Sequence, residues 1–310
     1  MNESKPLVSV ITVSYNAMPY IQETIRSVAD QDYDNIEHIV IDGASTDGTK
    51  EFLETCSNIT WISEKDNGQS EALNKGFRLA KGEIIGWLNA DDTYQPDAVS
   101  SAVELFSANL HVDILHGDLN IIDRNSKLIG KTKGDVFILN KLIVDTMIKQ
   151  PTVFIRRNVI ESLNGVNEKY HFVMDRELWL RAGLRNFRFK YVSSKIEANF
   201  RLCEGTKTHD NTIQFRLEWL DVLNNLSENE INKIGRKNLL YGRKKTITGL
   251  NMAYLMNAID SKSKKTKIYQ IYKSIKHDMS LFINLGFWRY AIAGLLGKPI
   301  NKYRRFEKQL

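Results

Sequence analysis

The sequence predicts an α/β fold: a doubly wound, mostly parallel sheet with helices on both faces, followed by a helical C-terminal extension. In the first part of the chain, short apolar runs alternate with stretches of helical spacing, and this β-α-β-α order favours a parallel sheet. Residues 213–226 and 236–276 have helical spacing throughout, which places them in an extension outside the sheet.

Each element follows from a local pattern, taken in chain order. Four apolar runs are predicted strands: residues 8–13, 37–41, 59–62 and 83–88. Three helices separate them: one with Ile21, Ile25 and Val28 on one face, a short one through Phe52 and Leu53, and one over residues 69–81. Later elements are strands at 112–116, 119–122, 188–193 and 196–200, a polar loop containing Gly130 and Gly134, and a helix at 173–184.

Charge divides the chain into two expected domains, residues 1–210 with the sheet and residues 211–310 as a basic helical extension. Residues 231–310 hold 18 Lys and Arg against 3 acidic residues, whereas residues 1–230 hold 25 basic and 34 acidic residues. An acidic front suits a metal site, and a basic tail suits phosphates or anionic lipid. Two cysteines are too few for a disulfide framework and no secretory signal is visible, so we expect a cytoplasmic location.

Four predicted strands run directly into polar clusters. These clusters are Tyr15 with Asn16, Asp42 to Asp47, Asp66 with Asn67, and Asn89 to Asp92. In open α/β sheets, ligands bind beyond the carboxyl ends of the strands. We therefore expect the four clusters to form one edge with one binding site.

Among these clusters, the adjacent residues Asp91 and Asp92 give the most specific indication of a function. Two adjacent carboxylates repel each other unless a cation or hydrogen-bond donors compensate. Mg²⁺ or Mn²⁺ takes carboxylate oxygens and leaves coordination positions open for a diphosphate, so both residues are predicted metal ligands. The alternatives are that Asp92 caps a helix starting near Pro96, or that both residues only turn the chain.

Several runs, taken together, resemble the family 2 glycosyltransferases. The resemblance is carried by residues 8–16, 40–49, 74–76 and 82–92, in the expected order. Two further runs, residues 150–154 and 174–181, resemble a bacterial branch that builds surface polysaccharides. The resemblance covers roughly residues 7–210.

This resemblance implies the GT-A fold and sugar transfer with inversion at the anomeric carbon. It implies a nucleotide-sugar half at about residues 1–110 and an acceptor half at about residues 111–210. We expect the acceptor to be a hydroxyl of a lipid-linked saccharide in the synthesis of O-antigen, capsule or exopolysaccharide.

Carried over by motif, the resemblance implies that Tyr15 and Asp42 hold the nucleotide base. A carboxylate suits the imide N–H of uracil, so a UDP-sugar is the favoured donor. The alternative for Asp42 is a turn residue before Gly43. Further contacts to the nucleotide-sugar are implied for Asp66, Asn67, Asn74, Asn89 and Asp91.

Two positions depart from the family pattern. The Asp-x-Asp motif is Asn89-Ala-Asp91 here, so an amide replaces the first carboxylate. Asn89 can still bond a ribose hydroxyl or a metal-bound water, and Asp91 is the expected direct ligand. Cys203 stands where many relatives carry a His, and the loss of that His would weaken a metal ligand or a phosphate contact. His209, nearby in the sequence, is either a substitute for it or a solvated loop residue.

Asp175 is the predicted catalytic base. Inverting transfer needs a group that removes the proton of the acceptor hydroxyl while its oxygen attacks opposite the leaving diphosphate. The alternative is a favourable charge at a helix N-terminus. Glu177 is expected to orient Asp175 or bind acceptor, and Arg201 and Lys207 to neutralise diphosphate.

Residues 281–297 are mostly apolar but short and interrupted for a membrane span. With the basic stretch 262–276, they suit a segment in a membrane interface, which would make the protein peripheral on the inner face of the cytoplasmic membrane. A helix packed on the catalytic domain is an equal alternative. Nucleic acid is not an expected partner, because no recognised binding module accompanies the charge.

Two other classes compete with the transferase prediction. A nucleotidyltransferase would need a glycine-rich, basic phosphate loop after the first strand, and residues 14–17 do not form one. An inactive membrane-binding relative of the enzyme is the other class, and Asn89 and Cys203 are the features that favour it.

Overall fold

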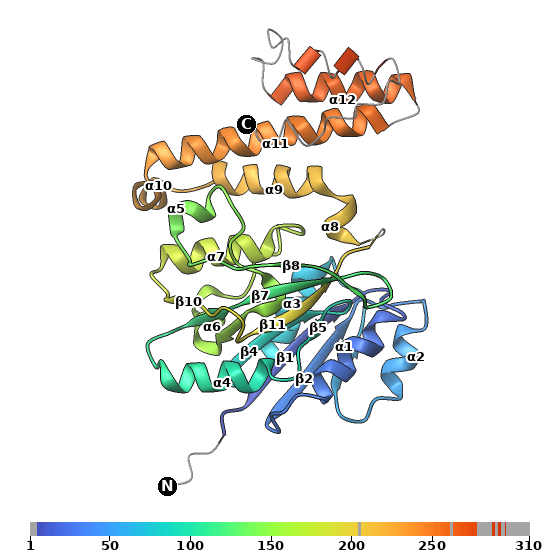
Figure 1. Ribbon diagram of the computed structural model, residues 1–310, viewed down its shortest axis with the longest axis vertical. Coiled ribbons are helices and arrows are strands. Elements are labelled where there is room, and N and C mark those ends of the chain that lie inside the picture. The colour runs from blue at the N-terminus through green and yellow to red at the C-terminus, as the bar shows by residue number, and fades with distance from the viewer. Residues whose placement is uncertain are drawn as a thin grey trace. The chain divides into compact units, whose positions relative to one another are not determined.

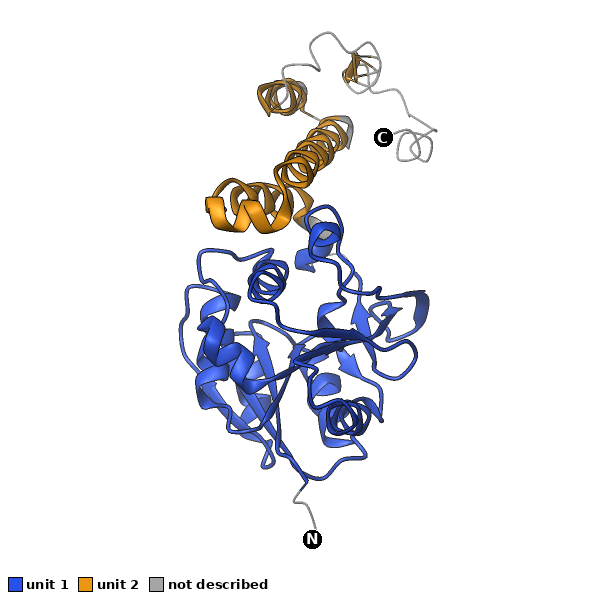
Figure 2. Cartoon of the chain, turned by 90° about the vertical axis from the view of Figure 1, so that its left-hand side faces the viewer, with its two compact units in different colours: residues 1–209 blue, residues 210–310 orange. Residues whose placement is uncertain are grey.

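The computed structural model describes residues 5–203, 206–260, 263–277, 287, 288, 291, 292 and 295 (Figure 1). The chain divides into two compact units, residues 1–209 and residues 210–310 (Figure 2). We refer to them as unit 1 and unit 2.

A seven-stranded sheet forms the centre of unit 1, with the order β10-β6-β9-β4-β1-β2-β3. Its strands are β1 (Val8–Ser14), β2 (Ile36–Asp42), β3 (Thr60–Ser63), β4 (Ile84–Asn89), β6 (Ile114–His116), β9 (Phe154–Arg156) and β10 (Phe189–Tyr191). β9 runs antiparallel to its neighbours β4 and β6, and the other pairs are parallel. The predicted α/β fold with a mostly parallel sheet is confirmed.

Strand register aligns the carboxyl ends of the central strands. Ser14 pairs with Asp42, and Asp42 pairs with Ser63, so β1, β2 and β3 end at the same level. Asn89, the last residue of β4, lies opposite Val13. The residues that follow these strands therefore emerge along one edge, where side chains from distant parts of the sequence can meet.

A second sheet has the order β5-β11-β7-β8. It comprises β5 (Thr93–Tyr94), β7 (Asp118–Ile122), β8 (Leu128–Thr132) and β11 (Glu197–Arg201). The prediction of a polar loop around Gly130 is wrong. Gly130 lies in β8, which pairs with β7 and places Gly130 opposite Ile121. β8 is an edge strand whose side chains are exposed or half-buried, so it lacks the buried alternation that reveals a strand in a sequence.

Helices cover both faces of the large sheet. Those of unit 1 are α1 (Tyr20–Ala29), α2 (Thr49–Glu54), α3 (Gln69–Leu79), α4 (Ala98–Ala108), α5 (Leu139–Leu142), α6 (Arg157–Leu163) and α7 (Met174–Leu184), with a 3-10 turn η1 at Gln150–Thr152. The short helix α8 (Lys207–Asp210) spans the boundary between the two units. Successive strand residues point to opposite faces. Ile84 and Leu88 of β4 belong to the cluster that contains α4, whereas Ile85 and Trp87 face α3, α6 and α7.

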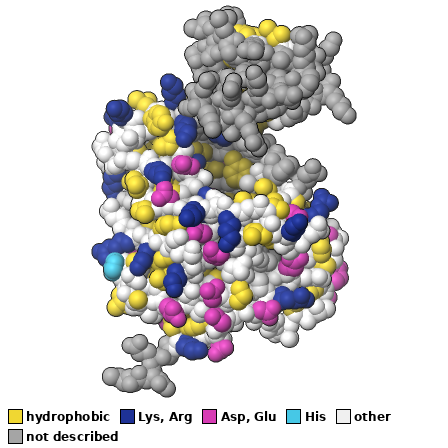
Figure 3. Space-filling view, viewed as in Figure 1, with side chains coloured by type: hydrophobic (Ala, Val, Ile, Leu, Met, Phe, Trp, Pro, Cys, Tyr) yellow, Lys and Arg dark blue, Asp and Glu magenta, His cyan; other side chains and the backbone are white. Residues whose placement is uncertain are grey.

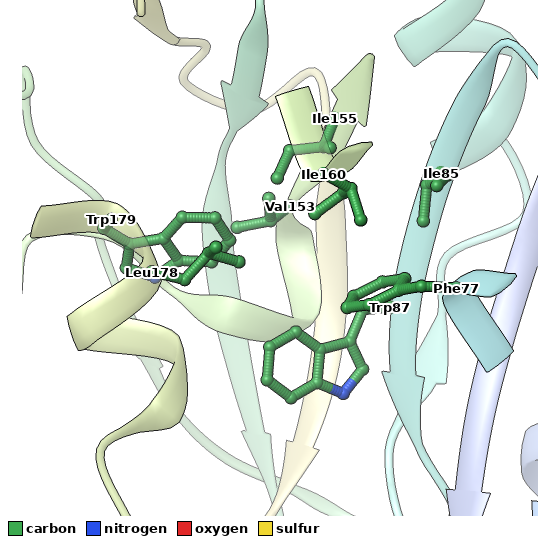
Figure 4. Close-up of a pocket in the computed structure, with 8 residues that line it drawn as sticks. All are labelled: Phe77, Ile85, Trp87, Val153, Ile155, Ile160, Leu178 and Trp179. Atoms are coloured by element: carbon green, nitrogen blue, oxygen red, sulfur yellow. The ribbon is translucent and has the colours of Figure 1, made fainter. Parts of the chain in front are cut away.

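The α3 side of β4 carries an apolar cavity (Figure 4). It is lined by Phe77, Ile85, Trp87, Val153, Ile155, Ile160, Leu178 and Trp179. Trp87 lies two residues before Asn89 on the same face of β4, and its indole N–H donates to Asn89 Oδ1 at 3.1 Å.

Unit 2 is helical, as predicted. It contains α9 (Thr212–Asn224), α10 (Glu228–Ile234), α11 (Arg236–Asp260) and α12 (Lys264–His277), and α11 packs against α9 and α12. The stretch expected at 236–276 is two helices, because the Ser263 hydroxyl accepts the Thr266 N–H and starts a new helix. Among the described residues, no helix is long and apolar enough to cross a bilayer.

Candidate functional site

An open aromatic platform lies where β1 and β2 end. Tyr15 follows β1, and its side chain is 71% exposed. A Cβ atom at Gly43, just after β2, would lie 3.3 Å from Tyr15 Cδ2 and 3.0 Å from Asp66 Oδ2. The Tyr15 ring and the Asp66 carboxylate therefore converge on Gly43. A ring beside a carboxylate can stack on a planar base and accept a hydrogen bond from its edge.

Asp42, the last residue of β2 and the neighbour of Gly43, is fully buried. Its carboxylate accepts hydrogen bonds from the Ser45 N–H (3.0 Å), the Ser45 hydroxyl (2.5 Å) and the Ser63 hydroxyl (2.6 Å). Ser45 in turn accepts the Asn16 N–H. Three donors leave this carboxylate about one further acceptor position. The two serines were not identified from the sequence, because a lone Ser carries no pattern.

The two other amides expected near the base have structural partners. Asn67 is exposed and lies two residues before α3, and its side chain donates to Glu71 in the first turn of that helix, at 2.6 Å. Asn74 is buried, and its side-chain amide donates to the Val166 carbonyl and accepts the Val166 N–H. The same amide also donates to the Glu168 carboxylate. Asn74 therefore joins α3 to the loop before α7. Its amide is used for this loop and not for the strand-end edge.

The Asp91–Asp92 turn is held from two sides. The buried Thr24 hydroxyl of α1 donates to the carbonyls of Ala90 and Asp92, at 2.9 and 2.8 Å. Arg201, at the end of β11, donates from its backbone N–H to the Asp92 carboxylate (3.1 Å) and from Nε to the Asp91 carbonyl (3.0 Å). Asp92 is fully buried, so its carboxylate secures the turn. Asp91 is half-buried, and its carboxylate makes no hydrogen bond to another side chain among the described residues.

Arg201 itself is fully buried. Its guanidinium donates to Glu23 (2.7 Å), to the Asp123 carbonyl (2.9 Å) and to Ser126 (3.0 Å), and it stacks 4.4 Å from the centre of the Tyr20 ring. These contacts leave it no face for a diphosphate. We assign Arg201 to holding the acidic turn, which differs from the role expected from the sequence.

Burial raises the pKa of both carboxyl groups of the turn, and the charge of Asp91 raises the pKa of Asp92 further. A divalent cation at Asp91 would relieve this cost. Within the described part of the chain, no three His, Cys, Asp or Glu side chains are grouped so that they could hold a metal ion by themselves. A metal here would need oxygens from a ligand to complete its coordination.

Asn89 is the centre of a hydrogen-bond network. Its Oδ1 accepts from Trp87 Nε1 (3.1 Å) and Gln69 Nε2 (2.9 Å), and its Nδ2 donates to Gln150 Oε1 (3.1 Å) and Asp92 Oδ2 (3.3 Å). Because an indole N–H can only donate, Trp87 fixes which way the amide of Asn89 points. Gln69 and Gln150 were not identified from the sequence, and both are needed to satisfy this amide.

The same network reaches Asp175. Lys207 Nζ donates to Gln69 Oε1 (2.9 Å) and to the His171 carbonyl. Asp175 is half-buried in the first turn of α7. Burial raises its pKa, and the positive charges of Arg176 and Lys207 oppose that rise. Asp175 is thus electrostatically coupled to Lys207, which the network joins to the end of β4.

Glu177 and Cys203 lie outside this network. Glu177 is buried in an ion pair with Arg181 at 2.8 Å, and Arg181 also donates to the carbonyls of Leu163 and Gly165. Cys203 lies with its sulfur 4.0 Å from the Tyr20 hydroxyl. The His209 side chain lies outside the described residues, so its expected role stays a prediction.

A parallel sheet with an aromatic platform and an acidic turn at its strand ends is typical of α/β enzymes that bind nucleotides. A family model described as Glycosyl transferase family 2 matches residues 9–160. An uncharacterized glycosyltransferase of Mycobacterium tuberculosis is 33% identical over 213 residues, which cover 66% of this chain and 77% of the relative. The chain belongs to glycosyltransferase family 2.

Two solved structures share its fold. S. aureus TarS 1–349 in complex with UDP-GlcNAc has a TM-score of 0.58 and 18% identity, covering 94% of this chain and 92% of that one. The mannosyltransferase PcManGT from Pyrobaculum calidifontis, in complex with GDP-Man and Mn²⁺, has a TM-score of 0.57 and 19% identity, covering 94% and 86%. The GT-A-like fold expected from the family resemblance is confirmed.

Asn89→Asp tests whether the amide is required. The change restores the family's carboxylate, yet we expect it to lower the free energy of unfolding by about 1–3 kcal/mol at neutral pH, because Gln150 Oε1 and Asp92 would face a third acceptor. The loss should shrink as pH falls, since a protonated carboxyl can donate again. Urea unfolding at several pH values measures this effect.

Asn35→Asp is the matched control, since the exposed amide of Asn35 donates only to the Lys5 carbonyl in the described structure. This control should change stability by less than about 0.5 kcal/mol. An Asn89→Asp protein as stable as the wild type at neutral pH would show that the network does not depend on the amide.

Proposed function

We propose that this protein transfers a sugar from a UDP-sugar to a hydroxyl of a saccharide acceptor, with inversion at the anomeric carbon. The observation that carries the proposal is the chain of contacts from the acidic turn to Asp175. Asn89 bonds Asp92 and Gln69, Gln69 bonds Lys207, and the charge of Lys207 acts on Asp175. The candidate donor site and the candidate base are therefore connected, and both would act in the transfer of the same sugar.

The donor base would stack on Tyr15. The exposed ring and the neighbouring Asp66 oxygen support this assignment, and Asp42 would keep the loop after β2 in place and offer its remaining acceptor position. Uracil carries an imide N–H that a carboxylate can accept. The TarS structure contains UDP-GlcNAc, which agrees with a uridine donor, whereas PcManGT contains GDP-Man.

Asp91 would hold Mn²⁺ or Mg²⁺ together with diphosphate oxygens. Its half-buried carboxylate, raised pKa and lack of a side-chain partner among the described residues fit a hard cation. Bound there, the ion would offset the negative charge that grows on the leaving nucleoside diphosphate. Asp92 would act by orienting the turn through the Arg201 N–H and Asn89.

Asp175 would accept the proton of the acceptor hydroxyl as that oxygen attacks the anomeric carbon. The C–O bond to the acceptor forms while the bond to the diphosphate breaks, and the proton moves to the Asp175 carboxylate. Burial supports this role because it raises the pKa of Asp175 towards the working pH. The Arg176 N–H and the charge of Arg176 oppose this rise in pKa, and the charge of Lys207 opposes it to a smaller extent.

The acceptor would be a lipid-linked saccharide of a bacterial surface polymer, reached at the cytoplasmic face of the membrane. The resemblance of residues 150–154 and 174–181 to polysaccharide-building enzymes supports this part of the proposal. The charge of the C-terminal extension supports a negatively charged membrane as the surface on which the acceptor is met.

Nucleotide binding tests the donor and metal assignments together. We expect UDP to raise the melting temperature in the presence of Mn²⁺, and GDP to raise it less. Asp91→Ala should abolish the Mn²⁺-dependent part of the shift. The exposed Asp32 offers a matched control, and Asp32→Ala should keep the full shift. If no nucleotide bound more tightly with Mn²⁺, the transferase proposal would fail.

The pH profile tests the base. Because Asp175 works only when ionised and its pKa is raised, kcat/KM should fall as pH is lowered through that pKa. Lys207→Gln removes the smallest of the contributions that lower this pKa, so the acidic limb should move slightly to higher pH. Measurement needs initial rates of UDP release with a saccharide acceptor between about pH 4 and 9.

Two further variants complete this test. Asp175→Asn should reduce turnover by about 10²–10⁴-fold while sparing UDP binding. Lys50→Gln, an exposed lysine on α2, should leave the profile unchanged. Near-normal turnover of Asp175→Asn would show that the base is another group, and an unmoved limb in Lys207→Gln would show that the charge of Lys207 does not set the pKa of the base.

A further inference from the structure

The outer face of α12 exposes large apolar and aromatic side chains. Ile268, Tyr269 and Tyr272 are 60%, 52% and 58% exposed. They lie three and four residues apart, so they share one side of the helix. Lys265 precedes them and Lys276 follows them at the same spacing, and both are exposed. We call these five residues, together with Lys273, the α12 face.

The opposite side of α12 is packed within unit 2. Lys267, Ile271 and Ser274 are buried, and the Ser274 hydroxyl donates to the Asn251 carbonyl of α11 at 2.9 Å. Ile271 joins an apolar cluster with Leu255 of α11. The helix is therefore fixed by its inner side, and the α12 face is not used for folding against α11.

The charge on α12 has one sign. The helix carries five lysines and no acidic residue, whereas acidic and basic side chains are interspersed on the face of unit 1 seen in Figure 3. Lys273 lies 5.3 Å from the centre of the Tyr269 ring, and its hydrogen bond with Tyr269 raises its pKa. The α12 face thus combines apolar surface in the middle with fixed positive charge around it.

We propose that the α12 face binds the surface of a bilayer that contains anionic phospholipid. Ile268 and the two tyrosine rings would enter the boundary between headgroups and acyl chains, and the lysines would contact phosphates of the headgroups. Tyrosine suits this depth, because its ring is apolar and its hydroxyl stays at the polar side. The helix lies along the surface, since its 14 residues are too few to cross a bilayer.

Two other occupants fit the α12 face less well. A second copy of the chain would bring the same lysines face to face, and like charges repel across such a contact. Nucleic acid would neutralise the lysines but would offer no apolar layer for the exposed Ile268. The α12 face is the surface through which the membrane contact of the proposed function would be made. Binding of the α12 face to lipid does not depend on the transferase activity; the proposed function only explains why the protein would need to reach a membrane.

Vesicle sedimentation of the full chain tests the proposal without turnover. We expect the protein to bind vesicles of phosphatidylcholine with about 30% phosphatidylglycerol and to bind pure phosphatidylcholine at least about tenfold more weakly. Lys265→Gln with Lys276→Gln should weaken binding to the anionic vesicles about thirtyfold. Ile268→Asn with Tyr272→Ser should weaken it about tenfold, including at high salt.

Leu110→Ser is the control for apolar surface, because Leu110 is 80% exposed in unit 1. Lys50→Gln with Lys81→Gln is the control for charge, and both controls should bind vesicles like the wild type. UDP binding by the same variants, measured without vesicles, should be unchanged, which separates failure of this inference from failure of the transferase assignment. Equal binding by the α12 variants and the wild type would overturn the inference, as would preferential binding of a DNA duplex.

Discussion

The candidate site depends on the hydrogen bonds and the ion pair that the buried guanidinium of Arg201 makes. A buried charge is tolerated only when it is paired and its donors are used, and Arg201 meets both conditions. It joins α1 through Glu23, the turn after β7 through Asp123 and Ser126, and the Asp91–Asp92 turn. Burial raises the pKa of Glu23, but hydrogen bonds from Ser126 and Arg201 lower it overall, so the partner stays ionised. These contacts hold the backbone of the acidic turn in place, and the Asp91 carboxylate keeps no side-chain hydrogen bond among the described residues.

Asn89 gives the same turn its second support. An Asp at this position would have to share space with Asp92 and with Gln150 Oε1, whereas the amide donates to both. The local hydrogen bonds therefore favour an amide over a carboxylate at this position. Asp91 is then the one carboxylate of the turn without a side-chain hydrogen bond among the described residues, so a metal proposed at this turn would take its other ligands from a diphosphate.

The sequence predicts the helices and strands whose apolar residues repeat with a short period, and the polar residues that directly follow a predicted strand. Apolar spacing locates α1, α3 and β4, and strand ends locate Tyr15, Asp66 and Asp91 on one edge. It does not predict the burial of Arg201 or the amide partners of Asn89, because Gln69 and Gln150 are distant in the chain and carry no periodic signal. β8 is missed for a similar reason, since an exposed edge strand has no apolar side to reveal it.

The most direct test is a crystal structure of the protein with Mn²⁺ and UDP, in which anomalous scattering locates the metal. We predict one Mn²⁺ within about 2.5 Å of an Asp91 carboxylate oxygen, with the diphosphate on the same ion and the uracil ring against Tyr15. A metal bound away from Asp91, or a nucleotide away from the ends of β1 and β2, would contradict the assignment of this edge as the donor site.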